Sequence, residues 1–182
     1  MILLPDEREI FYSNFLGLLS YVNDKYKLIQ NFGHPQNPAG LNLNEIKTLK
    51  DKLWSNVNII DEYIDSTKEI PDENVQIIQE WKKKISGRFI MMRHLKKYSI
   101  FLDDEHGLLY GVNGIQEPIS AMIPAALLPI MVEAVLLPFG DMIIYDGILC
   151  SQNIQLGPNI RKWFKGSYTE IKKEKGIIVS IK

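Results

Sequence analysis

Three stretches in the first half of the chain carry apolar residues at three- and four-residue steps, which is the period of an amphipathic helix. They span residues 6–30, 43–66 and 71–84. Pro5 suits the first helical position, and the acidic residues directly after it favour the positive end of the helix dipole. Gly, Pro and Asn crowd residues 31–42, which predicts a loop. The pattern therefore predicts about three helices before the chain changes character.

After Gly87 the apolar residues form short runs that are rich in β-branched and aromatic types, which is typical of strands. The prolines of segment 118–129 predict only one or two turns there, and the pattern returns to helical over 158–175, with Ile160, Trp163, Phe164, Tyr168 and Ile171 as its apolar side. The predicted strands are 88–95, 97–103, 108–114, 131–139, 141–147, 148–157 and 176–181.

The hairpin EAVLLPFGDMIIYDGIL, residues 133–149, is the clearest β signal. Leu136 and Leu137 are adjacent, as are Ile143 and Ile144, so both faces of each strand are apolar. Strands of this kind are buried on both faces. We expect the hairpin to be framework rather than a functional site.

The fold class that follows is α+β. A helical region over 1–86 precedes a β-rich region over 87–182, and the sequence leaves open whether the two form one structural unit or two. Short strands expose unpaired edges unless they close on themselves or are covered. We therefore predict a small antiparallel β-barrel-like unit with one late helix.

Composition limits the classes of protein to consider. The chain has 182 residues, 46% of them hydrophobic and 24% charged, as in soluble globular proteins. Its single cysteine, Cys150, rules out an internal disulfide framework and fits a reducing compartment. The start MILLPDERE lacks the features of a secretory signal, and the uncharged stretch 118–132 is too short for a membrane helix. We expect a cytoplasmic protein without membrane association.

Few side chains suggest catalysis or metal binding. The histidines His34, His94 and His106 are isolated from other metal ligands, although Asp103 to His106 could form either a solvated hairpin tip or a cation site. Asp141 and Asp146 lie about 16 Å apart along one strand, too far for an acid/base pair. Asp146 before Gly147 is a candidate polar turn residue. We predict no catalytic residue, no metal and no cofactor.

The basic residues offer a weak candidate interaction surface. Charge is uneven, with −5 over residues 1–78 and +4 over 79–182. Basic and aromatic residues alternate after Lys84, and a second basic group lies on the late helix at 161–165. Basic groups with aromatic neighbours on a small barrel are typical of single-strand nucleic-acid binders, but a pI of 6.3 argues against a strongly basic protein. The surface residues are Arg88, Arg93, Lys96, Lys97 and Tyr98.

Three segments resemble a family of Gram-positive bacterial proteins that has no established function. The segments are WKKKISGRFIMMRHLKKYSIFLDD, VEAVLLPFGDMIIYDGIL and GIIVSI. They match a pattern R-x-LKKY-x-IF followed by LLPF-x-x-x-IIYDG, over roughly residues 45–182. The resemblance implies that the hairpin and the basic strand pair are one unit. Some relatives have a Cys-rich zinc-binding tail. This sequence lacks that tail, so the resemblance implies no metal site.

Three functions remain open. The first is a non-enzymatic interaction module for another protein, suggested by the lack of paired reactive groups and by Trp54 and Trp81, which we expect to be exposed. The second is a nucleic-acid-binding small barrel that uses the basic strand pair. The third is an enzyme of unknown reaction in which Asp146 acts with a distant partner. The oligomeric state is not predicted.

Overall fold

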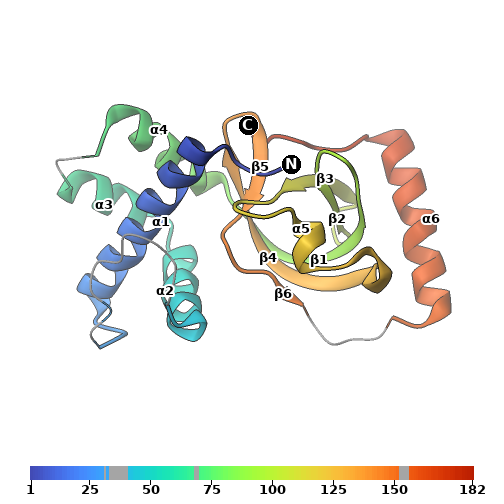
Figure 1. Cartoon of the computed structure of the whole chain (residues 1–182), viewed down its shortest axis with the longest axis horizontal. Coiled ribbons are helices and arrows are strands. Elements are labelled where there is room, and N and C mark those ends of the chain that lie inside the picture. The colour runs from blue at the N-terminus through green and yellow to red at the C-terminus, as the bar shows by residue number, and fades with distance from the viewer. Residues whose placement is uncertain (31, 33–40, 68–69, 152–155) are drawn as a thin grey trace. The chain divides into compact units, whose positions relative to one another are not determined.

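A computed structural model describes residues 1–30, 32, 41–67, 70–151 and 156–182. The chain divides into two compact units (Figure 1). One, the helical unit, consists of Leu4–Lys82. The other, the barrel unit, consists of Lys83–Lys182 together with Met1–Leu3. The boundary lies between Lys82 and Lys83, before the predicted one at residue 86, and the first three residues belong to the barrel unit, where Ile2 pairs with Gly114.

The described residues of the helical unit form four α-helices, one more than predicted. They are α1 (Pro5–Tyr26), α2 (Leu43–Ser55), α3 (Ile59–Ser66) and α4 (Asp72–Glu80), and a 3₁₀ turn at Trp81–Lys83 follows. The predicted helix 43–66 is broken because Asn56 ends α2 in an extended conformation, and its side chain accepts a hydrogen bond from the Asn58 backbone N–H. Asn side chains compete with helical hydrogen bonds in this way.

The first helix also ends earlier than residue 30. Lys27 adopts a left-handed conformation with φ 51°, and its N–H donates to the Asn23 carbonyl. The Asn23 side chain then bonds both the N–H and the carbonyl of Ile29, which folds the chain back. An αL residue at this position is a common way to end a helix.

The barrel unit contains six strands in its described part. They are β1 (Ile85–His94), β2 (Ser99–Asp103), β3 (Leu108–Asn113), β4 (Ile130–Phe139), β5 (Met142–Tyr145) and β6 (Cys150–Ser151). The sheet order is β1-β2-β3-β5-β4-β6, and β1 also pairs with β4, so five strands close into a barrel. The predicted barrel is confirmed, but it is mixed rather than antiparallel, because β3 and β5 run parallel.

Short helical elements follow the proline signals. Between β3 and β4 lie α5 (Ile119–Met122) and a 3₁₀ turn at Ala125–Leu127, as expected from the turn-rich segment. The late helix is α6 (Pro158–Glu174), and Gly176 follows it with φ 76°. The predicted closing strand is reduced to one bridge, in which Ile178 bonds the backbone of Leu109 and Gly111 in β3.

The hairpin of β4 and β5 is buried as its sequence predicts. Leu136, Leu137, Ile143 and Ile144 are each 0% exposed. Inside the barrel the Phe89 ring lies edge-on to the rings of Phe101 and Tyr110 at about 6 Å. β1 pairs with both β2 and β4, and its register with β2 shifts between Met91 and Arg93. A bulge of this kind lets a strand bend around a barrel.

Candidate functional site

The structure separates the predicted basic residues along β1. Arg88 lies near the start of the strand and Arg93 near its end, and five residues of strand span about 16 Å. Arg93, Lys96 and Lys97 are exposed together at the β1–β2 loop. Lys82 belongs to the helical unit, where it pairs with Asp61 at 2.7 Å. Only the residues from 93 to 98 therefore form one local surface.

The β1–β2 loop has a defined shape. The Leu95 N–H donates to the Tyr98 carbonyl at 2.8 Å. The Tyr98 ring lies over Gly111 of β3 so closely that a Cβ on that glycine would stand 2.9 Å from the ring. Gly111 thus lets the ring lie against the strand backbone, which holds the loop at the edge of β3.

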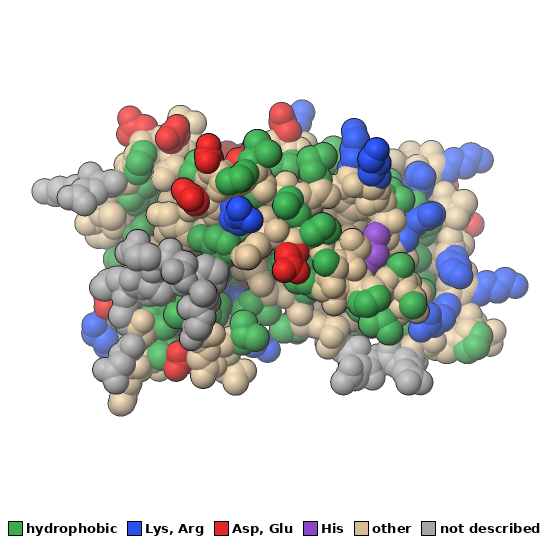
Figure 2. All heavy atoms as spheres, in the orientation of Figure 1, with side chains coloured by type: hydrophobic (Ala, Val, Ile, Leu, Met, Phe, Trp, Pro, Cys, Tyr) green, Lys and Arg blue, Asp and Glu red, His purple; other side chains and the backbone are tan. Residues whose placement is uncertain are grey.

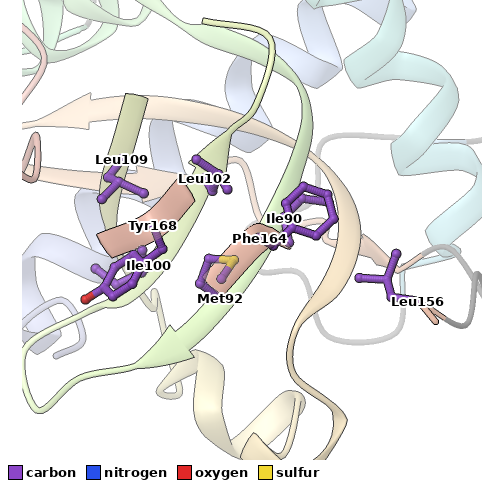
Figure 3. Packing of buried hydrophobic residues seen from close by; sticks show 8 residues of the cluster. All are labelled: Ile90, Met92, Ile100, Leu102, Leu109, Leu156, Phe164 and Tyr168. Carbon is purple, nitrogen blue, oxygen red and sulfur yellow. The ribbon is translucent and has the colours of Figure 1, made fainter. Parts of the chain in front are cut away.

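Helix α6 lies across the outer face of β1, β2 and β3. Its buried residues Phe164 and Tyr168, with Leu156 before the helix, pack on apolar side chains of the three strands (Figure 3). Leu95 and Tyr98 of the β1–β2 loop pack against the same cluster. The loop and α6 are therefore neighbours. The strand residues of the cluster are Ile90, Met92, Ile100, Leu102 and Leu109.

Backbone contacts fix both ends of α6. Near its start the Arg161 guanidinium donates to the carbonyls of Leu156 and Leu128, at 2.9 and 3.2 Å. Just after its end the Lys175 ammonium donates to the Gly107 carbonyl in the β2–β3 turn. The helix therefore runs from the β4 entrance to the β2–β3 end of the barrel.

The outward face of α6 differs from the prediction. Ile160 and Trp163 were assigned to its apolar side, but they are 50% and 56% exposed. At 3.6 residues per turn, Phe164, Tyr168 and Ile171 already fill the buried face, and Trp163 falls outside it. Four lysines of the helix are exposed, and the first and last are eleven positions apart, or about 16 Å along the helix: Lys162, Lys165, Lys172 and Lys173.

We use the name basic surface for seven exposed residues: Arg93, Lys96, Lys97, Lys162, Lys165, Lys172 and Lys173. Figure 2 shows Lys and Arg side chains gathered along the α6 side of the barrel unit, with few acidic ones among them. Within the described residues none of the seven forms an ion pair. The segments 93–97 and 158–175 together carry nine Lys and Arg against two Glu. The basic surface is thus largely uncompensated.

A pocket of about 430 Å³ opens beside the β1–β2 loop, and we call it the loop pocket. Its apolar wall comes from several elements and includes Ile2, Leu95, Val112, Pro118 and Ile119. Its polar side chains are His94, Lys96, Tyr98, Ser99 and Ser120. Lys96 belongs to both the pocket and the basic surface, so the two form one continuous site.

His94 holds the wall of the loop pocket together. Its Nε2 lies 2.8 Å from the Ile123 carbonyl, and its Nδ1 lies 2.7 Å from Ser99 Oγ. A carbonyl can only accept, so Nε2 carries the proton, and in the neutral ring Nδ1 accepts from the serine hydroxyl. Both nitrogens are occupied, and His94 ties the end of α5 to β2.

A second, smaller pocket of about 260 Å³ lies at the other end of β1, and it includes Arg88 and His106. His106 Nδ1 donates to Asp103, whose nearer oxygen is at 2.9 Å, and the same carboxylate accepts the His106 backbone N–H. The cluster from Asp103 to His106 is thus an internally bonded turn. No group of three metal-ligand side chains occurs in the described residues.

Tyr110 in this second pocket gives a pH-dependent prediction. Burial, and secondly the Asp103 carboxylate, raises the pKa of Tyr110 above its usual value. The unfolded chain then ionises first, so stability that is fully present below about pH 10 is lost as pH rises through the folded pKa. We expect Tyr110→Phe, which cannot ionise, to lose less stability than wild type between about pH 8 and pH 11. Urea unfolding midpoints across that range measure this, and parallel curves for the two proteins would contradict it.

Asp146 is fully buried, and its N–H donates to the Val135 carbonyl while its carboxylate accepts from the Ile148 N–H. It also lies near Lys84, whose pKa burial lowers and Asp146 partly restores. Lys84 precedes β1 and His94 ends it, so Asp146 lies at the opposite end of β1 from His94 and Arg93. Of the other candidates, Cys150 lies half-buried in β6, Asp141 lies exposed in the β4–β5 turn, and His34 lies outside the described residues.

The prediction that Trp54 and Trp81 are exposed is wrong. They are 8% and 0% exposed. Both pack on Phe15 of α1, at ring-centre distances of 6.2 and 6.3 Å, in the core of the helical unit. The apolar period places Trp54 at the edge of its stripe, but the rings of α1 cover both tryptophans. The exposed tryptophan is Trp163.

Sequence reasoning also missed Lys172 and Lys173 and the loop pocket. The lysines could have been found, because eleven residues are three helical turns and Lys162 and Lys173 therefore share a face. The pocket could not, because its walls come from segments that are far apart in sequence.

No protein-family model, no curated protein and no solved structure matches the chain. The family resemblance of the basic strand pair and the hairpin stays an expectation. Among the residues that the structure describes, no helix has the length and apolar character needed to cross a membrane.

Proposed function

We propose that the barrel unit binds single-stranded nucleic acid along the basic surface. The observation that carries this proposal is the charge distribution. Seven exposed cations without a described ion pair follow the β1–β2 loop and α6, while the whole barrel unit has 13 Lys and Arg against 9 Asp and Glu. A basic stripe along a helix is the electrostatic footprint of a polyanion binder. The near-neutral pI of the whole chain does not show that positive charge is concentrated on one surface.

The barrel type supports the proposal. Five strands close in the order β1-β2-β3-β5-β4 with a short helix between β3 and β4. Five-stranded Greek-key barrels of the OB type bind oligonucleotides with the loop that joins the first two strands and with the face of strands two and three. Here the first of these elements carries Arg93, Lys96 and Lys97.

The second of these elements, the face of strands two and three, is covered in this protein. Phe164 and Tyr168 of α6 occupy the outer face of β1 to β3, so a nucleic-acid strand cannot lie on that face. The lysines on the outward side of α6 supply a replacement surface about 16 Å long, with Trp163 exposed beside them. Exposed aromatic rings next to lysines let bases stack while phosphates are neutralised.

A non-enzymatic interaction module for another protein was the leading expectation from sequence. Part of its motivation was the exposure of Trp54 and Trp81, which are core residues. An acidic partner protein would meet the same basic surface, so it is kept as an alternative outcome of the test below.

The test is anisotropy of a labelled thymidine oligonucleotide titrated with the full chain at several salt concentrations. Each phosphate neutralised on a single strand contributes about −0.7 to the slope of log K against log salt. We expect a slope between about −3 and −5. The double variant Lys162→Gln/Lys173→Gln is expected to bind roughly tenfold more weakly and to reduce the steepness of the slope by about 1.4.

The matched control is Lys27→Gln/Lys47→Gln, which removes the same charge from exposed sites of the helical unit. It is expected to bind as wild type does. An equal loss of affinity in both double variants would mean that net charge alone explains the binding, and it would contradict a defined binding surface. Binding of polyglutamate in place of the oligonucleotide would favour a protein partner and overturn the proposal.

A further inference from the structure

We infer that the loop pocket holds one unstacked nucleobase of the bound strand. This inference rests on the proposed function and adds a base-dependent contact to it. Proteins read single strands by splaying bases out, packing them against side chains and bonding their edges. The loop pocket offers the features that such a contact needs.

Its size and lining fit a small planar ring system. Pockets for small molecules measure about 300–1,000 Å³, are mainly apolar and place a few polar groups precisely. The loop pocket measures about 430 Å³, and its apolar side chains include Val112 and Ile119, which are 0% and 2% exposed. These apolar side chains can pack against the face of a base, and Lys96 lies at the pocket for an adjoining phosphate.

Three polar side chains in the pocket are available to a ligand. The side-chain polar atoms of Lys96, Tyr98 and Ser120 have no hydrogen-bond partner within the described part of the chain. The hydroxyls of Tyr98 and Ser120 can each donate to and accept from a base edge, and Lys96 is placed for the phosphate of the same nucleotide. His94 is already bonded at both nitrogens, so it is a positioning residue for the wall.

The pocket wall is held in a fixed form before any ligand arrives. The Gly114 N–H donates to the Met1 carbonyl at 3.0 Å, and Ile2 bridges to Gly114. A Cβ on Gly114 would lie 1.9 Å from the Glu117 carbonyl oxygen, so only glycine allows this tight approach to α5. Preorganisation lowers the entropy cost of binding.

The experiment compares a thymidine oligonucleotide with one that has the same phosphates but an abasic sugar at every position. We expect wild type to bind the abasic strand roughly tenfold more weakly, since a stacked base contributes severalfold to a hundredfold in affinity. The variant Ser120→Trp, at an exposed residue of the pocket rim, fills the pocket and is expected to lose most of this difference. Its salt slope is expected to stay at the wild-type value.

Trp163→Ala is the comparison variant, because the exposed ring on α6 is also proposed to stack on bases. It is expected to lower the preference for the base-bearing strand less than Ser120→Trp does. Equal affinity of wild type for the two strands would overturn the inference, and so would a preference lost in Trp163→Ala but kept in Ser120→Trp. Failure of both strands to bind would instead reject the proposed function. Chemical-shift changes of Val112 on adding thymidine monophosphate give a second measure, and an unchanged Val112 at saturation would count against the pocket.

Discussion

Replacement of Phe164 by alanine is expected to lower the free energy of unfolding of the barrel unit by roughly 3–5 kcal/mol. Phe164 is 6% exposed and packs with Tyr168 on the outer face of β1, β2 and β3. Truncation removes its apolar burial and leaves a cavity between helix and sheet. Because α6 has few other buried residues in the described part, we also expect it to detach locally.

The matched control is Trp163→Ala at the adjacent position of the same helix. Trp163 is 56% exposed, and its ring lies edge-on to the Phe164 ring at 4.9 Å, so its removal is expected to cost only about 1 kcal/mol. Urea unfolding followed by circular dichroism, with hydrogen exchange of the β2 amides, measures both variants. Equal losses of unfolding free energy in the two variants would contradict the conclusion that Phe164 holds α6 on the sheet.

The second large effect is expected in the helical unit. Trp81→Ala is expected to lower its free energy of unfolding by about 3–5 kcal/mol. Trp81 is 0% exposed, and its ring lies 5.7 and 6.3 Å from the rings of Phe11 and Phe15. Aromatic pairs of this kind contribute beyond the area that they bury, so the upper part of that range is expected.

Trp81→Phe separates packing from hydrogen bonding. The indole N–H is buried without a partner in the described part of the chain, and a buried unsatisfied donor itself costs about 1–3 kcal/mol. Phenylalanine keeps a ring and removes that donor, so we expect a loss of about 1 kcal/mol or less. Unfolding by urea and hydrogen exchange of the α1 amides measure both variants. A Phe variant as unstable as the Ala variant would show that the N–H has a partner.

The combined stability and binding results also separate two roles of α6. Phe164 packs α6 onto the sheet, whereas Lys162 and Lys173 are exposed on the outward side of the helix. Lys162→Gln/Lys173→Gln is therefore expected to bind nucleic acid more weakly at unchanged stability. A loss of stability in that variant would mean that the binding defect reflects helix detachment.

Local pattern was enough for much of the fold. The hairpin from Glu133 to Leu149 was predicted as buried on both faces because adjacent apolar residues leave neither side polar, and Leu136 and Ile144 are fully buried. The late helix was placed correctly from Pro158 and Gly176, which act on the backbone next to them. Features of this kind depend on residues that are close in sequence, so a sequence determines them directly.

The break after Ser55 shows what the apolar period alone does not reveal. A continuous apolar stripe over 43–66 indicated one helix, yet Asn56 and Asn58 bond each other and redirect the chain. The cause is a side-chain hydrogen bond between residues two apart, which competes with the helical pattern.

The sequence by itself determined the α+β class, the order of its elements and the residues that make the β1–β2 loop basic. Only the tertiary structure decided that β3 and β5 pair in parallel, that α6 covers the sheet face and leaves Trp163 exposed, and that Lys96 borders a pocket. The reason is physical. Helix period and turn chemistry act over a few residues, whereas a barrel closure or a pocket joins residues whose separation in sequence carries no local signal.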